Sequence, residues 1–159
     1  DKTVTLYTDI VTPQEPDPIT PATPARAVGI KSTASNGGIR LQATIYPASN
    51  SVGTGMRLWT GMLTTPFWGP ATLVMRTSQG WRPMSAQEGL TIANILQTIT
   101  PATTGTTITL LDGDMTEADL AAISATVYLA YQNGTGAMEL FSQPLLACSG
   151  RTCAVPAPQ

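Results

Sequence analysis

The feature that most limits the fold of this chain is a series of short segments in which apolar and polar residues alternate between turn signals. The alternation is clearest in GGIRLQATIYPA, where Ile39, Leu41, Ala43 and Ile45 fall on one face. Because successive side chains of a strand point to opposite faces, this period of two predicts strands with one buried side. Further strands are predicted at residues 27–34, 54–65, 72–76, 106–112, 126–132 and 137–141.

Turn and cap signals place the breaks between these strands. Asn133-Gly134, between two alternating runs, predicts a tight hairpin because both residues accept positive φ. Thr116 followed by Asp119 resembles a capping box and predicts one or two helical turns. Residues 84–99 are ambiguous. Ser85 and Glu88 could cap a short helix there, but the apolar residues fit neither period, and the composition favours irregular or strand structure.

Short strands at a spacing of roughly 8–12 residues are typical of an all-β sandwich. One buried face per strand indicates antiparallel sheets. We therefore predict an antiparallel, Ig-like β-sandwich over residues 27–159, with an N-terminal strand extension and one or two short helices. Residues 12–26 hold five prolines and are predicted to be an extended, semi-rigid linker.

Residues 1–11 are predicted to form a separate strand in front of this linker. Val4, Leu6, Thr8 and Ile10 share one face, which carries no charge. If the strand is swapped into a neighbouring copy, these four residues form the subunit interface. Two alternatives stay open: an edge strand of the chain's own sandwich, and a disordered tail.

Composition excludes several functional classes. The eight basic residues are scattered singly and the net charge is -2, whereas a nucleic-acid-binding face needs clustered Lys and Arg. No apolar run approaches the roughly 20 residues of a membrane-spanning helix. The sequence contains no histidine, so Ser-His-Asp and Cys-His catalytic arrangements are impossible. We expect no enzyme and no cofactor.

An acidic cluster in LLDGDMTEAD is the one candidate for a metal site. Its members are Asp112, Asp114, Glu117 and Asp119. The spacing of an EF-hand calcium loop is not met, and acidic residues are favoured at a helix N-terminus in any case. We therefore interpret the cluster as a turn and a helix start, and predict no metal site.

Cys148 and Cys153 are separated by four residues, one of them glycine, which makes a small disulfide loop feasible. Free thiols or half of a metal site are the alternatives, but no second cysteine pair is present to complete a tetrahedral site. A disulfide indicates an oxidising compartment. The start at Asp1 rather than methionine fits a mature chain whose leader has been removed, or a piece of a longer protein.

Aromatic residues gather in WTGMLTTPFWGP and shortly after it. Trp59, Phe67 and Trp68 could face a ligand and line a carbohydrate-binding platform. Tryptophans on a sandwich more often fill the core or the space between sheets, and we favour that interpretation.

The segment DKTVTLYTDI resembles the N-terminal donor strand of chaperone–usher pilins of the alternate class, with matches at Lys2, Val4, Thr5 and Leu6. The proline linker and the cysteine loop depart from that family. Residues 43–141 resemble a β-sandwich module of exported proteobacterial surface proteins. The match consists of Gly80, Trp81, Pro83 and the run DLAAISATVYLAY, in which Ala130 stands where the module usually has glycine.

The first resemblance implies a pilin-like sandwich in a secreted, extracellular filament, a pilus or fimbria involved in cell adhesion. Its partners would be identical subunits in a head-to-tail homopolymer, with a periplasmic chaperone and an outer-membrane assembly factor. If the first strand packs within its own chain, the alternatives are a surface adhesin, a carbohydrate-binding module or the projecting domain of a viral capsid.

Overall fold

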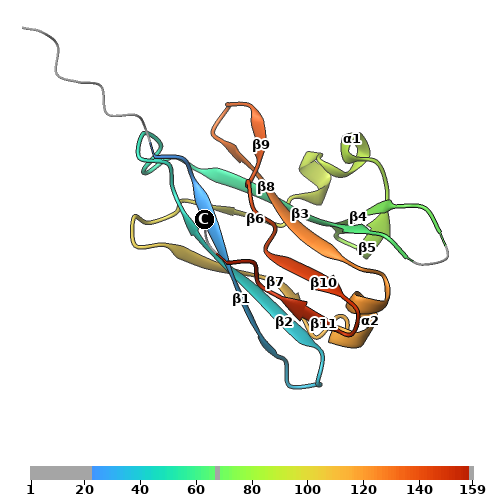
Figure 1. The fold of residues 1–159 in the computed structure, drawn as a ribbon. Helices are drawn as coiled ribbons and strands as arrows, with labels where there is room; N and C mark the ends of the chain where they lie inside the picture. Colours follow the sequence, from blue (N-terminus) through green and yellow to red (C-terminus); the bar gives the residue numbers. More distant parts are fainter. Residues whose placement is uncertain (1–22, 67–68, 158–159) are drawn as a thin grey trace, which may run out of the picture.

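The computed structural model describes residues 23–66 and 69–157, and its main elements are strands (Figure 1). The predicted strand 1–11, with Val4, Leu6, Thr8 and Ile10, lies outside the described residues, as do most of the proline segment and the aromatic pair Phe67 and Trp68.

The described strands form two antiparallel sheets. Their bounds are β1 (Arg26–Thr33), β2 (Ile39–Tyr46), β3 (Met56–Thr64), β4 (Thr72–Thr77), β5 (Gly80–Pro83), β6 (Gln97–Ile99), β7 (Thr106–Asp112), β8 (Thr126–Asn133), β9 (Met138–Leu140), β10 (Leu146–Ser149) and β11 (Thr152–Ala154). The smaller sheet has the order β1-β2-β7, and the larger has the order β11-β10-β8-β3-β4-β5, with β6 beside β3 and β9 beside β8. The predicted all-β, antiparallel sandwich is confirmed.

The core lies between the two sheets and comes from the alternation that the sequence displays. In β2 the four residues predicted to share a face are all buried, and β8 contributes Val127, Leu129 and Tyr131 from the opposite sheet. Because the intervening residues of β2 are only partly buried, that strand has one buried and one wetter face, as the period of two requires.

Strand β3 departs from this pattern because the middle of its second face is also buried. Met56, Leu58 and Met62 belong to the main core, but Trp59 on the other face is also buried. Trp59 forms a second cluster with Met75 and Ala130, packed by Leu90 and Ile95 from the segment that follows β5.

The helices are short and capped as their sequences indicate. Helix α2 (Glu117–Ala122) begins after Thr116, whose hydroxyl accepts the Asp119 N–H, so the predicted helical turns are confirmed. For residues 84–99 the preference for irregular or strand structure is wrong in part. A capping box of Ser85 and Glu88 starts α1 (Ala86–Gly89), a 3-10 turn η2 (Ile92–Asn94) follows, and only β6 is a strand.

Candidate functional site

One cleft of the sandwich lies along the seam where β1 approaches the end of β9. This seam cleft, as we name it, has a volume of about 360 Å³. One wall is formed by Thr23–Val28 and the other by Tyr131 and Leu140–Gln143. β1 of the first wall belongs to the smaller sheet, and Tyr131 and Leu140 of the second wall belong to β8 and β9 of the larger sheet. Ala27 and Tyr131 also pack in or against the main core, so the seam cleft borders the layer between the sheets.

Both strands that border the seam cleft have an unpaired edge. Among the described residues, β1 pairs only with β2 and β9 pairs only with β8. Beyond β9 the chain reaches β10 through residues 141–145, and two backbone bonds keep that stretch beside β8: Phe141 N–H to the Leu129 carbonyl and Leu145 N–H to the Val127 carbonyl. An unpaired strand edge carries free backbone donors and acceptors, which are the groups that an added strand needs.

The seam cleft has an aromatic back wall and little free charge. The rings of Tyr131 and Phe141 lie with their centroids 4.3 Å apart. The Tyr131 hydroxyl donates to a carboxylate oxygen of Glu139 at 2.6 Å. Burial, together with that carboxylate, raises the pKa of Tyr131 to about 12, so its phenol stays neutral at physiological pH. At the mouth, the Arg26 guanidinium stacks 4.0 Å from the centre of the Tyr46 ring.

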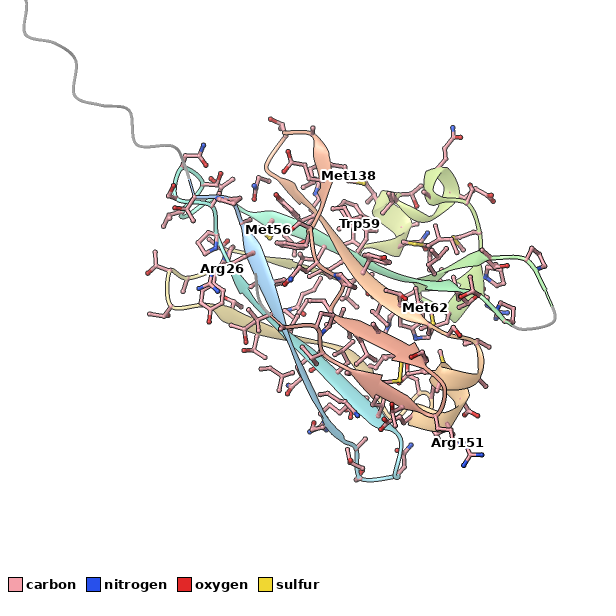
Figure 2. All side chains as sticks on the ribbon, viewed as in Figure 1. Arg26, Met56, Trp59, Met62, Met138 and Arg151 are labelled. Atoms are coloured by element: carbon pink, nitrogen blue, oxygen red, sulfur yellow. A yellow bond between two sulfur atoms is a disulfide. The ribbon has the colours of Figure 1, made fainter. Side chains whose placement is uncertain are left out.

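A second hollow, the outer-face groove, lies on the other side of the larger sheet and has a volume of about 490 Å³. Gly61 and Ala130, two small residues on neighbouring strands, lie at its floor beside Trp59. Figure 2 shows Trp59 near Met138, which lines the groove from β9. Leu140 is 60% exposed and borders both this groove and the seam cleft.

Trp59 is buried in the cluster that it forms with Met75 and Ala130, which we name the outer-face cluster. It is 1% exposed, and its indole N–H donates to the Thr91 carbonyl at 2.7 Å. With its donor occupied and its faces covered, Trp59 offers no free platform for a sugar ring. The other two aromatics named as possible ligand-facing residues, Phe67 and Trp68, lie outside the described residues.

Each carboxylate of the acidic cluster has a structural partner. Asp112 forms an ion pair with Arg40 at 2.9 Å, and Asp114 lies 4.0 Å from Arg76. Glu117 pairs with Lys31, and Asp119 caps α2. Over residues 23–66 and 69–157, no three side chains from His, Cys, Asp and Glu gather in a metal-binding group.

Cys148 and Cys153 form the predicted disulfide. They face each other across the β10–β11 hairpin, which turns at Gly150 with a φ of 65°. Strand β11 pairs with β10 through three residues only, so the covalent bond stabilises a hairpin that has few backbone hydrogen bonds.

We expect replacement of both cysteines by alanine to lower the free energy of unfolding by about 2 kcal/mol, because a loop this short constrains the unfolded chain only modestly. Urea denaturation of the oxidised parent and of the double variant measures the difference. A loss below about 0.5 kcal/mol would show that the bridge adds nothing to the β10–β11 hairpin.

Glu117 connects helix α2 to strands β1 and β11. One of its carboxylate oxygens accepts the Cys153 N–H at 2.7 Å, and Lys31 of β1 lies 3.0 Å away. The Lys31 ammonium also donates to the Cys153 carbonyl at 2.8 Å. The Cys153 N–H and then the Lys31 ammonium hold the pKa of Glu117 below its ordinary value of 4.5.

A lowered pKa in the folded state means that ionised Glu117 stabilises the fold. This contribution is present above pH 4.5, the ordinary value for the unfolded chain, and is lost as the pH falls through the lower folded value. We expect Glu117→Gln to be less stable than the parent at neutral pH, with the gap closing in acid. Urea midpoints measured down to about pH 3 test this. A gap that is constant with pH would contradict the assignment.

One structural feature that the sequence-based prediction missed is the seam cleft itself. A glycine inside a strand often marks a place where another backbone approaches closely, and Gly29 of β1 is such a residue. A Cβ on Gly29 would clash with the carbonyl oxygen of Leu145, the residue before β10 of the larger sheet. Gly29 is therefore the residue from which the close approach of the two sheets could have been predicted. The open cleft, which is lined by Thr23–Val28, ends at this residue.

Comparison with known proteins gives no match to a family model, to a curated protein or to a solved structure. Among the described residues, none of the helices has the length and apolar character needed to cross a membrane.

Proposed function

We propose that this chain is the structural subunit of an extracellular filament, and that it polymerises by inserting its N-terminal strand into the seam cleft of the next copy. The observation that carries the proposal is the seam cleft itself, where an unpaired strand edge lies beside an aromatic-walled opening into the core. An extended segment that pairs with a sheet edge and fills alternate pockets is the recognition mode known as β-augmentation.

The first eleven residues have the composition that such a cleft requires. Val4, Leu6 and Ile10 alternate with polar residues, so one face of the strand can enter the core while the other stays in water. Burying each of these side chains is worth roughly 1.5–3 kcal/mol. Each new backbone hydrogen bond along the β1 edge adds roughly 0.5–1.5 kcal/mol.

The proline segment favours exchange between copies over insertion into the same chain. Thr23, the first described residue, lies in the wall of the seam cleft, so the described part of the chain begins at the opening itself. An extended polyproline segment advances about 3.1 Å per residue, so residues 12–22 would span roughly 34 Å. A semi-rigid spacer of that length carries the strand away from its own cleft and toward that of a neighbour.

The contact is heterologous, because the strand of one copy meets a different surface, the cleft, of the next. Such contacts repeat without closing unless the rotation forms a ring, and therefore produce filaments. The disulfide is compatible with assembly in an oxidising, extracellular compartment.

Negative-stain electron microscopy and size-exclusion chromatography of the purified chain test this function. The intact chain is expected to form filaments, whereas a chain lacking residues 1–13 is expected to stay a soluble monomer. An intact chain that remains monomeric at high concentration would overturn the proposal. Filaments of equal length from the shortened chain would also overturn it.

A further inference from the structure

A strand of the predicted length does not fit the seam cleft as it stands. Nine to eleven residues extend roughly 30–36 Å at about 3.3 Å each. The open part lies beside Thr23–Val28 of the first wall, which is about six residues or roughly 20 Å. At Gly29 the seam is closed by the Leu145 carbonyl and by the side chain of Val155.

Val155 belongs to the short tail that follows β11. We define the C-terminal tail as residues 155–157, the last that the structure describes. Val155 is partly buried and packs against the main core, and its Cγ1 would lie 3.4 Å from a Cβ on Gly29. The Ala157 carbonyl accepts a hydrogen bond from the Gln143 side chain at 2.9 Å, in the wall of the open cleft. The tail therefore runs from the closed end of the seam to the open cleft (Figure 1).

The tail lies beside β1 at Gly29 but does not pair with it as a strand. The partners of β11 end at Ala154, and no strand includes Val155 or the residues after it up to Ala157. Pro156 has no N–H, so it cannot donate to a ladder at its position. The tail thus supplies one apolar side chain and one side-chain hydrogen bond, where an inserted strand would supply several of each.

The hairpin that precedes the tail is anchored independently of it. Cys153 is joined to Cys148 by the disulfide, and its N–H and carbonyl are bonded to Glu117 and Lys31. Release of residues 155–157 therefore leaves β10, β11 and α2 in place. Segments with few buried contacts and exposed hydrogen bonds open at low free-energy cost.

From these contacts we propose that the C-terminal tail is a built-in plug of the seam cleft. It covers the β1 edge at Gly29 in the free subunit, and the incoming N-terminal strand displaces it. This proposal rests on the proposed function, since it concerns regulation of the same cleft. Val155 occupies the place that an apolar residue of the donor strand takes after exchange.

The experiment is filament growth by the full-length chain, followed by light scattering, with the tail either locked or released. For the lock, Gln143→Cys and Ala157→Cys are introduced together and joined by a short bis-maleimide after folding. The matched control is Gln143→Cys alone, capped with a monofunctional maleimide. For release, the chain is ended after Ala154, and Val155→Asp serves as a second variant that keeps the full length.

The locked chain is expected to grow at least tenfold more slowly than the capped control, and the released chains several-fold faster than the parent. A locked chain that grows at the control rate would overturn the plug while leaving strand exchange intact. Released chains that grow no faster than the parent would overturn it too. If neither the parent nor the released chains form filaments, the proposed function itself fails, so the two failures are distinguishable.

Discussion

Leu6→Asp is expected to abolish filament formation and to leave the sandwich folded. Leu6 is central to the apolar face of the predicted donor strand, between Val4 and Thr8. Inserting aspartate there would bury an unpaired carboxylate between the sheets, which costs far more than one apolar contact gains. The parent and the variant are compared at equal concentration by electron microscopy and by thermal unfolding of the monomer.

The matched control is Tyr7→Asp, the same change one residue along the strand. Tyr7 belongs to the opposite face of the predicted strand, which would stay exposed to water after insertion. We expect Tyr7→Asp to form filaments at a rate within a few-fold of the parent. Equal loss in both variants would mean that the face of the strand does not matter, which an inserted strand does not allow.

Trp59→Ala is expected to lower the free energy of unfolding by about 3–5 kcal/mol, the usual range for removing a large buried aromatic residue. Trp59 is 1% exposed and joins β3 to the segment after β5 through its bond to the Thr91 carbonyl. Its loss leaves a cavity beside Met75 and Ala130. It also removes one of the two hydrogen bonds to the Thr91 carbonyl, which still accepts the Asn94 N–H. Urea denaturation gives the value directly.

Trp59→Phe separates packing from hydrogen bonding at the same site. Phenylalanine keeps part of the buried apolar volume and removes the indole donor, so we expect a smaller loss, of about 1–3 kcal/mol. Trp81→Ala is the comparison on β5, where the side chain is only partly buried, and its cost should be smaller than that of Trp59→Ala. If Trp59→Ala and Trp81→Ala cost the same, Trp59 is not the centre of the outer-face cluster.

The sandwich could be predicted from the sequence because its signals are local. The alternation of β2 lies within a dozen residues and becomes a buried face. The Asn133-Gly134 signal is equally local and marks the β8–β9 hairpin, but the loop is longer than the predicted tight turn, because Gln132 pairs with Met138 and only Gly134 of the two has positive φ. The Thr116 capping box and the Cys148–Cys153 bridge are equally short-range.

What could not be predicted depends on contacts between distant segments. The second face of β3 is buried because residues 84–96 fold over it, and a period of two carries no information about that cover. For residues 84–99 the prediction is wrong in part because the composition favours irregular or strand structure, whereas a genuine capping box at Ser85 starts a helical turn. The seam cleft and its tail require β1 and Val155 to meet, which only the tertiary fold brings about.

The most direct test of strand exchange into the seam cleft is to mix two variants that are each unable to polymerise. The first is Leu6→Asp, with a defective strand and an intact cleft. The second carries Leu140→Lys and Ser142→Trp, two exposed positions of the cleft wall, and keeps its strand intact. Ile92→Lys, at a side chain that is 73% exposed on η2, is the surface control and should polymerise normally.

Size-exclusion chromatography with light scattering gives the mass of the mixture. We predict a heterodimer that contains one copy of each variant and grows no further, because one strand and one cleft are functional. A mixture in which both variants remain monomeric, or filaments formed by the cleft variant alone, would contradict the account.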